Sequence, residues 1–327
     1  SGTATVAQVN TVSGVTSGTT TATISDGDMS TLAGITGTGN AYTVTVTDTS
    51  ADAAALNTLD GKTTVAVTVN SATITGTAGA VVTAFQAEGS TLSGLDDAAA
   101  NINSGTATVA QVNTVSGVTS GTTTATISDG DMSTLAGITG TGNAYTVTVT
   151  DTSADAAALN TLDGKTTVAV TVNSATITGT AGAVVTAFQA EGSTLSGLDD
   201  AAANINSGTA TVAQVNTVSG VTSGTTTATI SDNDMSTLNG ITGTGNAYTV
   251  TVGDGSVDAT KLNELDAKTT VAVTVDSTTV TGTASALVTA YAAQGTSISG
   301  LGNEAVTVNS GTATVAQVNT VSGVTSG

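Results

Sequence analysis

A repeat of 103 residues is the feature of this sequence that most constrains its fold. Residues 1–103 and 104–206 are identical, residues 207–309 repeat the unit with scattered substitutions, and residues 310–327 repeat residues 1–18. Repeats of this kind fold as similar supersecondary units, each of which packs mainly on its neighbours. We therefore expect three repeat units and the start of a fourth to form one continuous body, in place of separate globular domains.

A shorter motif, apolar-x-x-apolar-x-Gly, subdivides each repeat unit. Its copies begin at Val9, Met29 and Leu56, more loosely at Val82, and again at Val112 in the next unit. Apolar residues three or four positions apart share one face of a helix, and a closing glycine is typical of a helix C-cap. The motif predicts helices of one to three turns. Residues suited to N-caps stand before them, at Thr5, Asp28, Ser50 and Thr77.

Each short helix is followed by a run with the alternation of a β-strand. In Thr20–Ser25, Tyr42–Thr47 and Val65–Val69, apolar residues fall on one face and mostly threonines on the other. The absence of proline suits central strands, which must donate hydrogen bonds to both neighbours. We expect a right-handed parallel β-solenoid with short helices, an α/β solenoid with about four turns in each 103-residue unit. One continuous parallel sheet would cover one side and a row of helices the other.

Charge and composition exclude several classes of function. The chain has 24 acidic residues, four basic residues and a net charge of −20, so we expect no nucleic-acid partner. Its most apolar uncharged run, Thr63–Ala87, is interrupted by threonine and asparagine at strand-like intervals, which argues against membrane insertion. The chain has no histidine or cysteine, and its paired carboxylates recur in every unit. A catalytic site is normally single, so we expect a protein that is not an enzyme and requires no cofactor.

Carboxylates at the corners between strands and helices are the candidate metal ligands. Asp-x-Asp at a turn can bind Ca²⁺ through carboxylate and backbone oxygens, and stacked copies would form a series of sites. The alternative is that Asp28 and Asp52 cap helices and interact with the positive N-terminal dipole. The candidate Ca²⁺ ligands are Asp26, Asp28, Asp48, Asp52, Asp129, Asp131, Asp151, Asp155, Asp232, Asp234, Asp254 and Asp258.

Threonine and asparagine also recur at fixed places. Stacked threonine pairs, such as Thr21/Thr23, Thr43/Thr45 and Thr73/Thr75, resemble the arrays of ice-binding solenoids, although threonine is also simply a good strand former. Asn10 and Asn57 follow the leading apolar residue of the motif, which predicts stacked asparagines that satisfy corner backbone groups.

Three runs carry a resemblance to a known repeat style. They are Ala22–Met29, Leu56–Thr64 and Ile298–Val308. These runs resemble the tandem repeats of long secreted and cell-surface bacterial proteins, notably cyanobacterial ones, of haemolysin-type or adhesin-like character. The Gly-Gly-x-Gly-x-Asp nonapeptide of calcium β-rolls is absent, so the metal ligands of that family do not carry over.

The resemblance implies a structural or adhesive role at the cell surface or outside the cell. Together with the acidic composition, it predicts a stiff rod or spacer within a filament, a surface adhesin or a biofilm matrix. Other copies of the chain are the expected partners, through end-to-end or continuous filament assembly. Divalent cations and surface glycans are further candidate partners.

Overall fold

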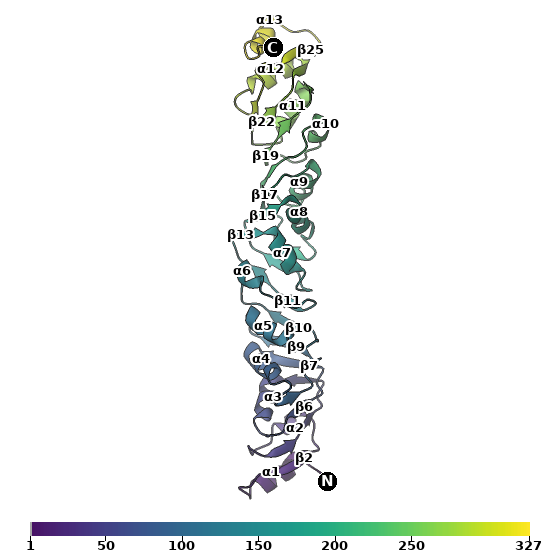
Figure 1. Ribbon diagram of the computed structural model, residues 1–327, viewed down its shortest axis with the longest axis vertical. Helices are drawn as coiled ribbons and strands as arrows, with labels where there is room; N and C mark the ends of the chain where they lie inside the picture. Colours follow the sequence, from purple (N-terminus) through teal and green to yellow (C-terminus); the bar gives the residue numbers. More distant parts are fainter. Residues whose placement is uncertain (1) are drawn as a thin grey trace. The chain divides into compact units, whose positions relative to one another are not determined.

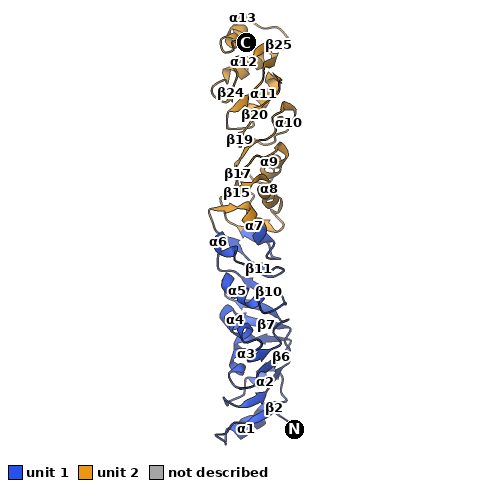
Figure 2. Cartoon of the chain, viewed as in Figure 1, with its two compact units in different colours: residues 1–150, 161–171 blue, residues 151–160, 172–327 orange. Residues whose placement is uncertain are grey.

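The computed structural model describes residues 2–327, which form two compact units (Figure 2). The first unit contains residues up to 150 and residues 161–171, and the second contains residues 151–160 and 172–327. Both units are α/β, and Figure 1 shows short helices alternating with short strands along the chain. The boundary falls inside the second sequence repeat, so the compact units do not coincide with the 103-residue units.

The first compact unit begins with a short strand and helix, and this alternation continues through it. Its elements are β1 (Thr3–Ala4), α1 (Val6–Ser13), β2 (Thr21–Ile24), α2 (Met29–Leu32), β3 (Ala41–Thr43), β4 (Thr45–Val46), β5 (Ser50–Asp52), α3 (Ala53–Asp60), β6 (Val67–Val69), β7 (Thr73–Thr77), α4 (Ala78–Gln86), β8 (Leu92–Ser93), β9 (Ala99–Ser104), α5 (Val109–Ser116), β10 (Thr123–Thr126), α6 (Met132–Leu135), β11 (Ala144–Thr146) and β12 (Thr148–Val149).

The second compact unit has the same alternation. Its elements are β13 (Ser153–Asp155), β15 (Thr176–Thr180), α8 (Ala181–Gln189), β16 (Leu195–Ser196), β17 (Ala202–Ser207), α9 (Val212–Ser219), β18 (Thr226–Thr229), α10 (Met235–Leu238), β19 (Ala247–Thr249), β20 (Thr251–Val252), β21 (Ser256–Asp258), α11 (Ala259–Asp266), β22 (Val273–Val275), β23 (Thr279–Thr283), α12 (Ala284–Ala292), β24 (Ile298–Ser299), β25 (Ala305–Ser310) and α13 (Val315–Ser322). Helix α7 (Ala156–Asp163) and strand β14 (Val170–Val172) contain residues of both compact units.

Residues in paired parallel strands are 20 to 27 positions apart in the chain. Thr23 of β2, for example, pairs with Thr3 before it and with Thr43 after it, and Thr73 of β7 pairs with Ala99 of β9. We call the stretch of chain from one strand to its paired partner a coil. Within the first compact unit the sheet orders are β1-β2-β3, β4-β6-β8 and β11-β10-β9-β7-β5. Within the second they include β13-β15-β17-β18-β19, β20-β22-β24 and β21-β23-β25.

The prediction of a single continuous sheet is wrong for the described residues, because the pairing is divided among several sheets. Strand β3 pairs with the coil before it, whereas β4 and β5 pair with the coil after it. The offset between paired residues also changes here, from 20 between Thr23 and Thr43 to 23 between Thr45 and Thr68. A longer coil shifts the pairing along the chain, so one ladder ends and two others begin.

The core of each compact unit is built mainly from aliphatic residues, with a few buried aromatic rings. Leu56 and Leu59 of α3, Val81 and Phe85 of α4, and Val112 of α5 are buried. Successive helices pack on one another, α3 on α4 and α4 on α5 in the first unit and α8 on α9 in the second. Burying one such leucine contributes roughly 1.5–3 kcal/mol, so each coil stabilises its neighbours by modest amounts. Among the described residues, no helix has the length and apolar character needed to cross a bilayer.

Three of the four predicted N-caps are confirmed. Thr5, Asp28 and Thr77 cap α1, α2 and α4, and each side chain accepts a backbone N–H of the first turn. The prediction for Ser50 is wrong, because this residue begins β5 and Asp52 caps α3 instead. A separate short strand, β5, occupies residues 50–52, so the helix begins after Asp52.

The closing glycines of the motif do not adopt a left-handed C-cap. Gly14 and Gly61 are the C-caps of α1 and α3, but their φ values are −75° and −66°. Any residue can adopt this conformation, and alanine does so at Ala267, the equivalent of Gly61 in the third repeat. At the Gly61 position, therefore, glycine marks the helix end without being required by the backbone.

Substitutions in the third repeat compensate one another across neighbouring coils. A Cβ atom added at Gly27 would lie 2.6 Å from the Thr47 Oγ1 atom. In the third repeat the first position is Asn233, and the position facing it is Gly253, where an added Cβ would lie 2.9 Å from Asn233 Nδ2. In both repeats, one of the two facing positions is glycine and the other has a larger side chain, but the glycine is on opposite coils. The contact between coils therefore constrains both positions.

Candidate functional site

The acidic corners contain three kinds of carboxylate, and the first kind caps its own helix and binds a serine. Asp28 Oδ1 accepts the Thr31 N–H at 3.0 Å and the Ser30 hydroxyl at 2.6 Å. The hydrogen bond from Ser30, followed by that from the Thr31 backbone, lowers the pKa of Asp28. Asp131 and Asp234 make equivalent bonds, and their pKa values are lowered for the same reason.

The second kind of carboxylate caps a helix of the preceding coil. Asp26 Oδ2 accepts the N–H of Val6, the first residue of α1, at 2.7 Å. Asp48 Oδ2 likewise accepts the N–H of Met29, the first residue of α2, at 2.8 Å. Helices α1 and α2 are thus capped twice, once by their own N-cap residue and once from the next coil. Equivalent bonds join Val109 to Asp129, Val212 to Asp232 and Met235 to Asp254.

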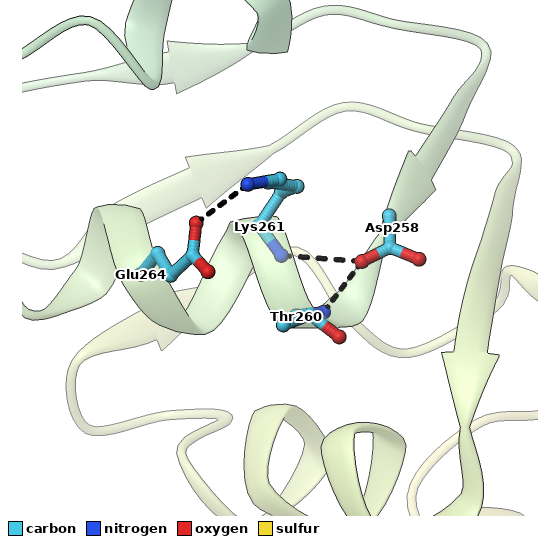
Figure 3. A network of polar contacts seen from close by, with 4 residues as sticks. All are labelled: Asp258, Thr260, Lys261 and Glu264. Carbon is cyan, nitrogen blue, oxygen red and sulfur yellow. Dashed lines mark hydrogen bonds and ion pairs between the residues drawn. The ribbon is translucent and has the colours of Figure 1, made fainter.

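The third kind of carboxylate caps its own helix without the serine contact. Asp52 and Asp155 accept the N–H groups of Ala55 and Ala158, each at 2.9 Å. In the third repeat, Asp258 accepts two amides, those of Thr260 and Lys261 (Figure 3). The capping interpretation of Asp28 and Asp52 is confirmed in the structure.

Each corner carboxylate described above therefore accepts a hydrogen bond from at least one backbone N–H group. Asp151 follows β12 at the position equivalent to Asp48. Within residues 2–327, no group of three or more acidic side chains is placed to hold a metal ion. The Ca²⁺ prediction remains a prediction. Melting temperatures measured with calcium and with a chelator test it, and a higher midpoint in calcium would support it.

The surface of the third repeat differs from the others at one exposed helix. Lys261 Nζ lies 2.9 Å from Glu264 Oε2 on α11, as Figure 3 shows. The equivalent residues of α3 are Ala55 and Thr58, so this ion pair distinguishes the third repeat. Because both side chains are half exposed, the pair contributes little to stability.

The recurring asparagines bind backbone groups of the next coil and not one another. Asn10 Nδ2 donates to the Gly34 carbonyl at 2.8 Å, and its Oδ1 accepts the Thr36 N–H at 3.1 Å. Asn57 Nδ2 donates to the Ala80 carbonyl at 2.9 Å. The expectation that these side chains satisfy corner backbone groups is confirmed, but the stacked pairing between asparagines is not observed for these residues.

A buried polar cluster was missed by sequence reasoning. Tyr145 and Thr123 are fully buried, and burial raises the pKa of Tyr145. The nearby hydroxyls of Ser116 and Thr123 lower the pKa of Tyr145, but by less than burial raises it. Among the described residues, none of these three hydroxyl groups has a partner at hydrogen-bond geometry. Asn143 Oδ1 accepts the Thr123 N–H at 2.8 Å. The Thr166 hydroxyl accepts the N–H of Tyr145 and donates to its carbonyl. Tyr42 and Tyr248 occupy the equivalent positions of the other repeats. The recurrence of tyrosine every 103 residues was therefore the one sequence signal for this cluster.

The third repeat contains a buried tyrosine–glutamate pair, Tyr291 and Glu304. Glu304 is buried, and its Oε1 accepts the N–H groups of Gly302 and Asn303 at 3.0 and 3.2 Å. The Tyr291 hydroxyl donates to Glu304 Oε2 at 3.4 Å. Burial, and then the charge of Glu304, raise the pKa of Tyr291. The equivalent residues in the first repeat are Phe85 and Ala98, so hydroxyl and carboxylate occur together.

The geometry of the corners and clusters thus supports capping, coil-to-coil bonding and packing. Searches for matching protein families, curated proteins and solved structures found no match to this chain.

Proposed function

We propose that this chain is a structural repeat segment of an extracellular bacterial filament or surface adhesin. In this role it is a right-handed parallel α/β solenoid that works as a stiff, acidic rod or spacer. The observation that carries the proposal is the cross-coil bonding. A side chain of one coil satisfies the backbone of its neighbour in each of the three repeats, as Asp26, Asp129 and Asp232 do.

Two physical properties suit the chain to a spacer. Stability in such an arrangement comes from contacts between neighbouring coils, so a chain can lengthen without a new core. The net charge of −20 keeps neighbouring rods apart in solution. Its surface location and its self-association belong to the same proposal.

Small-angle X-ray scattering and electron microscopy of the purified chain test the proposal. About 12 to 13 coils at roughly 4.8 Å each give a rod on the order of 60 Å long. A rod of that length, or a filament that continues it, is the expected result. A compact globular particle would contradict the proposal.

Ice binding is the second candidate function, and a column of threonines favours it. Thr3, Thr23 and Thr43 are exposed and pair in register on adjacent parallel strands. The array is interrupted elsewhere, because Thr21 pairs with Ala41 and Thr73 pairs with Ala99. Thermal hysteresis and ice shaping would support this function, and the absence of both would exclude it.

A further inference from the structure

A hollow of about 280 Å³ in the second compact unit is lined by residues of two helices that contact each other, α10 and α11. Leu238 and Asn239 lie at the end of α10, Glu264 and Leu265 belong to α11, and Lys268 lies just after the end of α11. The two leucines are buried, whereas the other three residues carry a carboxamide, a carboxylate and an ammonium group. Three different polar groups therefore border one small hollow.

Two of these three polar residues are specific to the third repeat. Asn239 and Glu264 stand where the first repeat has Ala33 and Thr58, and the second repeat is identical to the first. Lys268, in contrast, has a lysine at the equivalent position of both other repeats. The third repeat has thus gained a carboxamide and a carboxylate beside a lysine that all three repeats share.

The amine and the carboxamide at this hollow are both without a partner. Among residues 2–327, no hydrogen bond or ion pair joins the Lys268 ammonium or the Asn239 side-chain amide to another residue. Both residues are partly buried. Glu264 Oε2 lies 2.9 Å from Lys261 Nζ on the same helix (Figure 3). The hollow therefore brings together an amine, a carboxamide and a carboxylate that can transfer a proton between them.

We propose that Lys268 and Asn239 form an isopeptide bond, with Glu264 as the proton-transfer group. Glu264 first takes a proton from the lysine ammonium. Lys268 Nζ then forms a bond to Asn239 Cγ, and the bond from Cγ to Nδ2 breaks. Glu264 passes a proton to the departing nitrogen, which leaves as ammonia and takes up a further proton from the solution. Overall, a lysine ammonium and a carboxamide become a secondary amide and an ammonium ion, and no oxidant or cofactor is consumed.

The fold favours this reaction and gives the bond a mechanical role. Two groups held at one hollow by folded helices react within a single molecule, which removes the cost of bringing them together from solution. Lysine has a flexible stem, so its amine can move across a hollow of this size. The bond would join the end of α10 to the chain after α11, and a covalent link of this kind restricts the unfolded chain as a disulfide does. The inference goes beyond the proposed spacer role and does not depend on it.

Mass spectrometry of the purified chain tests the bond. The intact mass should be lower than the mass of the sequence by one molecule of ammonia. Trypsin cleaves after lysine, and the lysines of this chain are Lys62, Lys165, Lys261 and Lys268. Without the bond, digestion of the denatured chain releases residues 262–268 as a separate peptide. With the bond, Lys268 is blocked, so residues 262–327 should appear joined to residues 166–261.

Three single variants and two internal controls assign the bond to these residues. Asn239→Ala, Lys268→Arg and Glu264→Gln should each have the full mass of its sequence and release residues 262–268. Asn239→Ala restores the residue of the first two repeats, so it should fold as they do. Residues 1–62 and 63–165 of the unmodified chain should be released without a link, because their repeats lack the asparagine and the glutamate.

Several outcomes would overturn the proposal. The full sequence mass in the unmodified chain would show that no bond forms. Cyclisation of Asn239 onto the Gly240 amide would release the same ammonia but leave residues 262–268 free, so ammonia loss without a branched peptide would count against the bond. A branched peptide in Glu264→Gln would contradict the proton transfer assigned to Glu264.

Discussion

Among single residues, we expect the buried hydroxyl of Tyr145 to oppose folding, because it has no partner at hydrogen-bond geometry among the described residues. It has left water without gaining a hydrogen bond from the described residues, a loss that costs about 1–3 kcal/mol. We expect Tyr145→Phe to raise the free energy of unfolding by about 1 kcal/mol, because the ring stays and the unpaired hydroxyl goes. Urea denaturation of the purified variant measures the change. A loss of stability would mean that the hydroxyl is bonded after all.

The matched control for this change is Tyr291→Phe. The Tyr291 hydroxyl donates to the buried carboxylate of Glu304, so its removal should lower the free energy of unfolding by about 1–3 kcal/mol. Phe85 occupies the equivalent position of the first repeat, which shows that the ring fits there. Opposite signs for the two Tyr→Phe substitutions are the expected outcome.

Asp28, Asp131 and Asp234 make stability depend on pH in acid. Hydrogen bonds, first of all from the adjacent serine, lower their pKa values in the folded state. A lowered folded pKa stabilises the protein above the ordinary carboxyl pKa of about 3.9, and this contribution is lost as pH falls through the folded value.

We therefore expect the melting temperature to fall as pH drops below about 4. Replacing all three residues by asparagine keeps an N-cap but removes the titrating group, so the fall should be shallower. Thermal melts followed by circular dichroism between pH 2 and about 6 measure it. Asp97→Asn, at an exposed position outside the caps, is the control that should retain the full fall. Identical curves for the triple variant and the unmodified chain would show that the caps do not titrate.

Between elements, the contact of Gly27 with Thr47 can be tested with a pair that the chain itself contains. Gly27→Asn alone should destabilise the protein by about 1–3 kcal/mol, because the new side chain meets Thr47 in the next coil. Adding Thr47→Gly recreates the Asn233/Gly253 pair of the third repeat and should restore much of the loss. A double-mutant cycle measured by denaturant unfolding gives the coupling energy. Additive effects would mean that the two coils do not constrain each other there.

Features of helices and strands could be predicted where they depend on residues close together in the sequence. The caps at Thr5, Asp28 and Thr77 follow from residue type and from the apolar run behind them. The bond from Asp26 to the Val6 amide joins residues 20 positions apart, so no local pattern could reveal it. Ser50 failed as a cap because strand β5 competes for the same residues and extends to Asp52.

At the scale of the whole molecule, the repeat predicted the α/β character and the parallel pairing, but not the division into several sheets. That division depends on coil lengths, which change at β3, β4 and β5, and on which neighbour each short strand pairs with. The Tyr145 cluster was hidden for a related reason. Its hydroxyls come from three separate segments of the chain, and only folding brings Ser116, Thr123 and Tyr145 together.

If stability is shared between neighbouring coils, damage to one coil should remain local. Leu59 is buried at the α3 face, and Leu59→Asp would place an unpaired charge there at a local cost of about 4 kcal/mol or more. We expect hydrogen exchange to show loss of protection in the neighbouring coils while distant coils keep theirs. Thr58→Glu, on the exposed face of the same helix, is the control, because Glu264 occupies that position in the third repeat. Unchanged stability of Leu59→Asp would contradict the stacked-coil interpretation. Loss of protection along the entire chain would instead show one cooperative core.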